Sequence, residues 1–404
     1  MNAESTVLEH GGVEDVSCDG PVDEVIDGGV TDGSAIDESA FDDVHRLLAD
    51  GERLGSEGHH DEAVAAFRSA RDLARTIGDA PMVAHADDRL GAAHWEAGRL
   101  REAEHHLRAA LAVHESGSDH ERLSWARYRL GWLLAATPGS EPRRQEALDL
   151  LGSARSMAAD HDDRHRVASC DEKAAWVMAA RRDHAEAVAL LHRVVAVFEA
   201  VGATADARVA RANLGVQLIA VGSVDEAEFH LRRAWSDGRR AGDVDPGVAS
   251  RLARLLADAG RPEEALAVLD ESATTIGVAG AAERAAHHLA RARACNVAQL
   301  RVASREAAEA AVVALRGARL PGLHAEALEF IARCHEADAE GLDGVEAARQ
   351  TDRARVLLGE AVALYLVADQ TDDARRVARD LVPSPPVADD ETHEMPPLST
   401  GVYL

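Results

Sequence analysis

The chain has 404 residues and a formal net charge of −27, with 71 acidic residues against 44 lysines and arginines. A field of that sign repels polyanions, so the charge argues against a general nucleic-acid binder and against a binder of anionic membranes. Aromatic residues make up only 3% of the chain, alanine and leucine dominate, and no β-rich alternation of apolar and polar residues is present. This composition favours an all-helical protein.

Residues 1–40 form the first of three predicted segments. They carry eleven acidic residues, no lysine or arginine, and two Gly-Gly pairs. Such a segment cannot bury enough apolar surface to offset the entropy that it would lose on ordering. We therefore expect residues 1–40 to be disordered.

The pattern of the folded part is clearest between Leu90 and Ala110, which reads LGAAHWEAGRLREAEHHLRAA. Apolar and small residues recur at helical spacing on both sides of Gly98, which predicts two amphipathic helices joined by a tight turn. A small residue at Gly91 allows the two helices to approach closely, and Leu107 fills the gap to the next hairpin.

The same pattern returns about every 40 residues. An insertion around residues 138–143 lengthens the third unit, and a last helix at about 371–382 would cap the array. One hairpin cannot bury its apolar face alone, but eight stacked hairpins share a continuous core. The sequence thus predicts one helical segment over residues 41–382. The small residues at the matching position of the eight units are Gly51, Gly91, Gly131, Ala175, Gly215, Ala253, Cys295 and Cys334.

Period and pattern together resemble the tetratricopeptide repeat, and the resemblance covers about residues 41–370. It implies an all-α fold, a right-handed superhelical solenoid of about eight hairpins plus a capping helix, in which first-helix positions line the concave face. The resemblance is specific for architecture and leaves the particular function open.

Four aromatic residues fall at first-helix positions that line the concave face in the repeat family. They are Trp95, Tyr128, Trp132 and Trp176. Clustered on one wall, they would hold a peptide or a helix of a protein client. The alternative is that they pack between helices as ordinary core. Many relatives grip a terminal carboxylate with Lys and Asn, but the equivalent places here carry Asp88, Ala92 and Glu172, so we do not expect that clamp.

We expect a protein without catalytic activity, cofactor or metal. The sequence has no Gly-rich phosphate loop, no HExxH pair and no nucleophile elbow. Its adjacent histidines, at 59–60, 105–106 and 287–288, would point about 100° apart on a helix, so such a pair does not chelate an ion. Four cysteines without CxxC spacing, no signal peptide and no long apolar span indicate a reducing cytoplasm.

Residues 383–404 form the third predicted segment, an extended and mobile tail that holds five of the chain's twelve prolines. It ends in Gly401, Val402, Tyr403 and Leu404. These four residues are similar to the C-terminal motif of actinobacterial proteasome activators, which end in Gly-Gln-Tyr-Leu, and to the hydrophobic-Tyr-any motif of eukaryotic activators. Val402 departs from the pattern, which has Gln at that place.

The resemblance implies that the tail inserts between α-subunits of the 20S proteasome core. Tyr403 would fill the pocket, the Leu404 carboxylate would pair with a basic residue, and Gly401 would permit the bend. Lys173 is the only lysine of the chain. Since bacterial proteasome substrates are tagged on lysine, a protein that works beside this machinery benefits from offering a single acceptor.

Two functions remain open from the sequence. The first is an ATP-independent activator or adaptor that docks on the 20S core; an activator would need a ring of copies, hence a homo-oligomer, whereas an adaptor works with one copy. The second is a regulatory or sensor scaffold that binds a peptide or protein in its groove, without a role for the tail. Deleting Tyr403 and Leu404 distinguishes the two.

Overall fold

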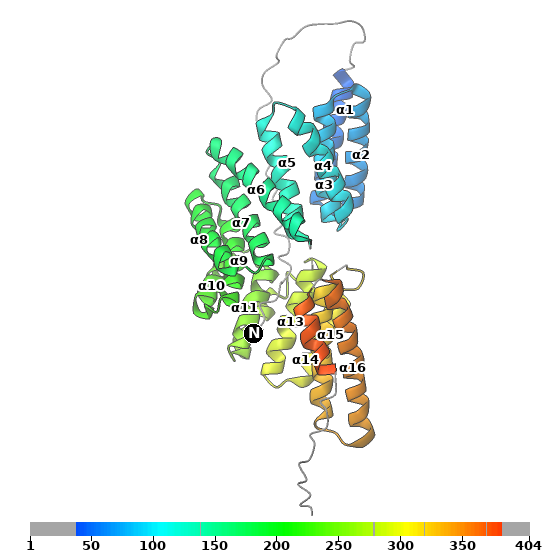
Figure 1. Cartoon of the computed structure of the whole chain (residues 1–404), viewed down its shortest axis with the longest axis vertical. Coiled ribbons are helices and arrows are strands. Elements are labelled where there is room, and N and C mark those ends of the chain that lie inside the picture. The colour runs from blue at the N-terminus through cyan, green and yellow to red at the C-terminus, as the bar shows by residue number, and fades with distance from the viewer. Residues whose placement is uncertain (1–37, 138, 278, 319, 369, 382–404) are drawn as a thin grey trace, which may run out of the picture. The chain divides into compact units, whose positions relative to one another are not determined.

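The computed structural model describes residues 38–137, 139–277, 279–318, 320–368 and 370–381. The predicted segments 1–40, except its last three residues, and 383–404 lie outside these ranges, and with them the proposed docking residues 401–404. Every regular element in the described ranges is a helix, and there are seventeen (Figure 1). The predicted all-α class is therefore confirmed. Within the same ranges, no helix combines the length and the apolar character needed to cross a membrane.

The helices pair in chain order into eight hairpins followed by one further helix, as the repeat pattern predicts. The hairpins are α1 Glu38–Ser56 with α2 His60–Ile77, α3 Ala80–Glu96 with α4 Leu100–Ser116, α5 His120–Ala136 with α6 Glu141–Asp160, α7 Arg164–Ala180 with α8 His184–Val201, α9 Thr204–Ala220 with α10 Val224–Ala241, α11 Pro246–Asp258 with α12 Pro262–Ser272, α13 Ala281–Val297 with α14 Arg301–Ala314, and α15 Pro321–Ala339 with α16 Gly344–Val367; the last helix, α17, is Thr371–Leu381.

The chain divides into two compact units, Met1–Arg319 and Leu320–Leu404. The described part of the first holds α1 to α14, and that of the second holds α15 to α17. The prediction of one segment over 41–382 did not include this division. In the second unit Glu329 of α15 accepts a hydrogen bond from Tyr365 on α16 at 3.0 Å and bonds from Arg376 on α17, so one carboxylate joins all three helices.

A glycine on the first helix lets its partner helix approach closely in at least two of the hairpins. A Cβ built on Gly91 would lie 2.6 Å from Cγ of Leu107 on the partner helix α4, and one on Gly215 would lie 2.7 Å from Cγ of Leu231 on α10. Both leucines are buried. Because these distances are too short for carbon atoms, the predicted small-residue position is a packing requirement of the hairpin.

Glycine also ends helices where the sequence indicates a turn. Gly78 is left-handed, and its N–H donates to the carbonyl of Ala74 at 3.0 Å, which closes α2. The next residue, Asp79, accepts a hydrogen bond from the Met82 N–H at 2.9 Å and so caps α3. The Gly-Asp pair therefore ends one helix and begins the next.

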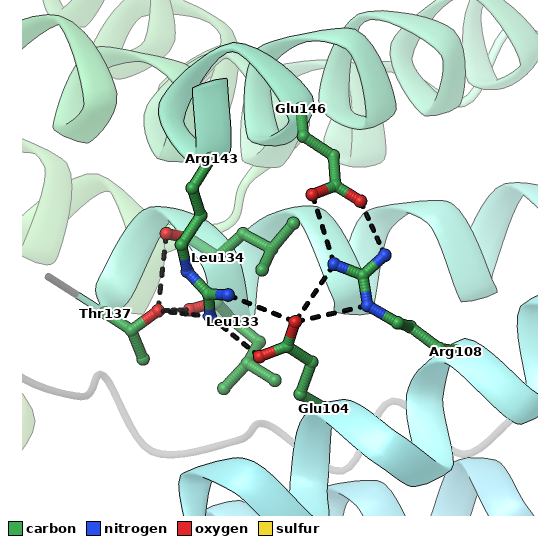
Figure 2. A network of polar contacts seen from close by, with 7 residues as sticks. All are labelled: Glu104, Arg108, Leu133, Leu134, Thr137, Arg143 and Glu146. Atoms are coloured by element: carbon green, nitrogen blue, oxygen red, sulfur yellow. Dashed lines mark hydrogen bonds and ion pairs between the residues drawn. The ribbon is translucent and has the colours of Figure 1, made fainter. Parts of the chain in front are cut away.

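The insertion in the third unit extends a helix. Helix α6 begins at Glu141, so Arg143 lies in its first turn, where it reaches back to α4. Figure 2 shows its guanidinium between Thr137 and Glu104, whose carboxylate accepts at 3.1 and 3.0 Å. Hydrogen bonds from Arg143, and also from Arg108, hold the pKa of Glu104 below its usual range. The inserted residues thus tie the second helices of two consecutive hairpins together.

Burial of His287 on α13 leads to a prediction about pH. Its side chain is 2% exposed, and burial, followed by the charges of His288 and Arg291, lowers the pKa of His287 to about 4. Between pH 6.5 and 4 the unfolded chain binds a proton here that the folded chain does not. Stability is therefore complete above pH 6.5 and lost as the pH falls through this window, by about 2 kcal/mol at pH 5.

Denaturant unfolding of the wild type and of His287→Asn at pH 8 and pH 5 measures this contribution. The variant is expected to show a smaller stability difference between the two pH values, by about 2 kcal/mol. Replacement of the exposed His161 by Asn serves as the control and should keep the wild-type difference. An equal pH dependence in all three proteins contradicts the prediction.

Candidate partner-binding face

The four predicted aromatic residues lie on the first helices of three consecutive hairpins. Trp95 is on α3, Tyr128 and Trp132 are on α5, and Trp176 is on α7. The rings of Trp95 and Trp132 meet edge to face with centroids 4.7 Å apart, and the Tyr128 ring lies 5.9 Å from that of Trp132. Trp176 is joined to them through Lys173. We call these four residues the aromatic cluster.

Three rings of the aromatic cluster are buried, and one is partly accessible. Trp95, Tyr128 and Trp176 are 6%, 8% and 4% exposed, whereas Trp132 is half-buried. Burial also raises the pKa of Tyr128 well above its usual value, so its phenol stays neutral. Three of the four rings therefore pack between hairpins, and Trp132 is the most accessible of the four.

Lys173 lies between two rings of the cluster. Its Nζ is 4.7 Å from the centroid of the Trp132 ring and 4.5 Å from that of Trp176, a cation–π arrangement. The ammonium donates to Oε2 of Glu172 at 2.8 Å, and Oε1 of the same carboxylate accepts from Nδ2 of Asn213 at 2.9 Å. All three polar side chains are buried.

The structure corrects the interpretation of Lys173 as a single acceptor for tagging. Its ammonium is buried and paired with Glu172, so a modifying enzyme cannot reach it in the folded chain. Sequence reasoning also treated Glu172 only as evidence against a carboxylate clamp. The signal that could have revealed this site is the one lysine of the chain, placed among tryptophans at the repeat spacing.

A fifth aromatic side chain, Trp125 of α5, lies beside the cluster and was missed. Its ring meets that of Tyr128 edge to face at 5.8 Å. The guanidinium carbon of Arg166 lies 4.6 Å from the Trp125 centroid, and that of Arg129 lies 5.9 Å from it. Since Trp125 stands one helical turn before Tyr128, helical spacing alone could have pointed to it.

Contacts between successive first helices repeat with a constant offset. In each pair the two residues are 41 positions apart, which is one repeat plus one residue. The same offset therefore joins α3 to α5, α5 to α7 and α7 to α9. These contacts set how each hairpin is placed on the previous one. The pairs are Asp88–Arg129, Trp132–Lys173, His165–Asp206 and Glu172–Asn213.

Two titratable side chains at or near this face are held in their neutral forms. Cys170, the thiol beside Tyr128, is buried, and burial raises the pKa of Cys170 to about 12, so the thiol is not a nucleophile at neutral pH. Burial, followed by the charge of Arg89, lowers the pKa of His85 on α3 to about 4, which keeps that ring uncharged. The face offers aromatic surface with ion pairs at its margins.

Three further side chains could hold a metal ion, on the second helices of the fourth and fifth hairpins. They are His192 of α8 and Glu226 and His230 of α10, and one ligand atom from each lies within 4.8 Å of the others. The sequence argument against a metal considered adjacent histidines and missed this set. Its signal is the spacing of four residues between Glu226 and His230, which puts both on one helix face.

Comparison with known proteins agrees with the repeat pattern. The tetratricopeptide-repeat family model matches residues 83–120, which cover most of α3 and α4. No curated protein sequence matches the chain significantly. Thus a single hairpin carries a recognisable family signature.

Solved structures share the arrangement of helices. The crystal structure of aspartyl phosphate phosphatase F from Bacillus subtilis has a TM-score of 0.54 at 14% identity, covering 70% of this chain and 72% of that one. The apo form of RapI has a TM-score of 0.53 at 12% identity, covering 68% and 97%. A tetratricopeptide repeat protein from Parabacteroides merdae has a TM-score of 0.49 at 15% identity, and the match covers 72% of this chain and 99% of that one. The first two structures support a tetratricopeptide-like solenoid of helical hairpins, and the repeat signature itself lies in residues 83–120.

Proposed function

We propose that the chain is a non-enzymatic interaction scaffold that holds a protein or peptide partner against the face around the aromatic cluster. The observation that carries this proposal is the gathering of four aromatic rings from three consecutive hairpins, two of which, Trp132 and Trp176, lie against Lys173. Aromatic side chains on a rigid support give large contact area at low entropic cost, and they are enriched at the centre of protein interfaces.

The partner's contacts would centre on Trp132, the half-buried ring of the cluster. The buried rings beneath it fix its orientation, and the ion pair between Asp88 and Arg129 lies at the margin. An apolar or aromatic side chain of the partner would stack on Trp132, and its polar groups would reach the marginal charges. A peptide in extended or helical form suits such a face.

Replacing half-buried alanines beside the cluster tests this proposal without emptying the core. Ala92 on α3 and Ala135 on α5 are half-buried first-helix residues, and Ala135 packs against the core around the cluster. The double variant Ala92→Glu with Ala135→Glu should lose partners that co-purify with the wild-type chain. Truncating Trp95 is a poorer test, because removing a buried tryptophan costs about 3–5 kcal/mol and affects the fold.

The matched control places the same charges on second helices. Ala112 on α4 and Ala189 on α8 are exposed, so Ala112→Glu with Ala189→Glu should keep both the fold and the partners. Circular dichroism and the melting temperature verify that both proteins fold. If Ala92→Glu with Ala135→Glu is folded and captures the same partners as the control, the face around the aromatic cluster does not bind them.

A second candidate function is docking on the 20S proteasome core through Gly401, Val402, Tyr403 and Leu404, as an ATP-independent activator or adaptor. It is favoured by the similarity of these residues to the tails of actinobacterial activators. It is also favoured by the chemistry of the single lysine, because a scaffold whose only lysine is buried is protected from lysine tagging. In this proposal the aromatic face holds the client and the tail delivers it.

Binding of the full chain to an actinobacterial 20S core tests the docking. Removing Tyr403 and Leu404 should abolish co-elution with the core, whereas Leu398→Ala, outside the motif, should not. Faster hydrolysis of small peptides with the intact chain indicates an activator, and binding without faster hydrolysis indicates an adaptor. If the intact chain neither binds nor stimulates the core, docking is rejected and the scaffold function stands alone.

A further inference from the structure

Two consecutive hairpins bring a histidine and a glutamate–histidine pair together on their second helices. His192 lies on α8, and Glu226 and His230 lie one helical turn apart on α10. Nε2 of His192 is 3.3 Å from Oε1 of Glu226, and the rings of His192 and His230 have centroids 5.5 Å apart. In Figure 1, α8 and α10 lie to the left of α7 and α9, the first helices of the same hairpins.

We propose that His192, Glu226 and His230 form a binding site for a first-row divalent transition metal of the zinc class. Two imidazoles and one carboxylate are ligands that Zn²⁺ accepts, and this set occurs where three protein ligands leave one position open. With metal–ligand bonds of about 2.0–2.2 Å, two ligands of a tetrahedral ion lie about 3.3–3.5 Å apart. The separation between His192 and Glu226 agrees with that distance.

The surroundings favour a cation. Nδ1 of His230 is buried and has no hydrogen-bond partner within the described ranges, and a buried unpaired polar atom is costly unless a ligand satisfies it. Arg211, whose charge acts on His230, is itself paired with Glu199 and Asp237, which offsets its repulsion of a bound ion.

Exposure decides what the ion can do there. The side chains of His192 and Glu226 are 41% and 48% exposed, so the fourth position faces solvent and accepts water or a donor from another molecule. Because the ligands come from α8 and α10, the ion would link two hairpins through side chains. Metal should therefore raise the melting temperature of the chain.

Titration of the chelator-treated full chain with Co²⁺ and Zn²⁺ tests the proposal. The wild type is expected to bind one equivalent of metal more than the double variant His192→Ala with His230→Ala. Glu226→Gln should lower the affinity for that equivalent at least tenfold. Bound Co²⁺ should give visible d–d absorption without a thiolate band, since no cysteine is among the ligands. The control, His120→Ala with His161→Ala, removes two exposed histidines elsewhere and should retain the site.

The thermal shift gives an independent readout should the double variant fold poorly. Zn²⁺ should raise the melting temperature of the wild type and of the control, and leave Glu226→Gln nearly unchanged. Identical stoichiometry and affinity in the wild type, the double variant and Glu226→Gln would overturn the proposal. So would the absence of both a bound equivalent and a thermal shift in the wild type.

Discussion

Replacing Lys173 with methionine is expected to lower the free energy of unfolding by about 3–5 kcal/mol. Methionine keeps much of the apolar stem between Trp132 and Trp176 but removes the ammonium. The Glu172 carboxylate then stays buried, keeps its hydrogen bond from Asn213 and loses the ammonium that balances its charge. A buried charge without a partner is far more costly than the pair is stabilising, so the loss should be large. Urea unfolding followed by circular dichroism measures it.

A second substitution distinguishes an unpaired charge from lost packing. In Lys173→Met with Glu172→Gln, the neutral amide still meets Asn213, and most of the lost stability should return. Hydrogen exchange in α7 and α9 locates the effect, because each hairpin of a repeat array contacts mainly its neighbours. Wild-type stability in Lys173→Met alone would mean that the buried pair is not needed, and a double variant as unstable as the single one would assign the loss to packing.

Replacing Gly91 with valine is expected to cost about 3 kcal/mol. The new Cβ would lie 2.6 Å from Cγ of Leu107 and 3.3 Å from the carbonyl oxygen of Ala103. Leu107 is buried and cannot turn away, so α3 and α4 must separate, as in other overpacked cores. The midpoint of urea unfolding should fall accordingly.

The chain offers a matched control for this substitution. Gly152 lies within α6, and a Cβ built there meets no atom within 4 Å. Gly152→Val should change stability by less than about 0.5 kcal/mol, because helix propensities of valine and glycine differ little. In a double-mutant cycle, Gly91→Val together with Leu107→Ala should lower the free energy of unfolding by less than the sum of the two single substitutions, because the smaller side chain makes room for the valine. Equal effects at Gly91 and Gly152 would contradict the proposed helix contact.

The hairpins could be predicted because their contacts are local. The small residue at position 91 and the leucine at 107 belong to one hairpin, so their spacing already contains the contact that the structure shows between them. The same holds for the turn glycines, such as Gly98, whose left-handed conformation follows from sterics within a few residues. Fold class, hairpin number and the capping helix at 371–381 all follow from this local pattern.

The candidate site could be predicted only in part. The repeat register placed Trp95, Tyr128, Trp132 and Trp176 on first helices, and the structure brings them together. The register carries no information on how deeply each ring is buried. That depends on the neighbouring hairpin, whose Lys173 fills the space between two rings. The docking tail at Tyr403 and Leu404 stays a prediction from sequence.

The sequence by itself determined the repeat period, the position of every hairpin and the small residues that close them, because these depend on short-range spacing. Only the tertiary structure decided which side chains of different hairpins meet. Lys173 meets Trp132, and Glu172 meets Asn213, each across 41 positions of the sequence. The ligand set of His192, Glu226 and His230 likewise joins residues of two hairpins. Such contacts depend on how each hairpin is rotated and shifted on the previous one, which no single unit encodes.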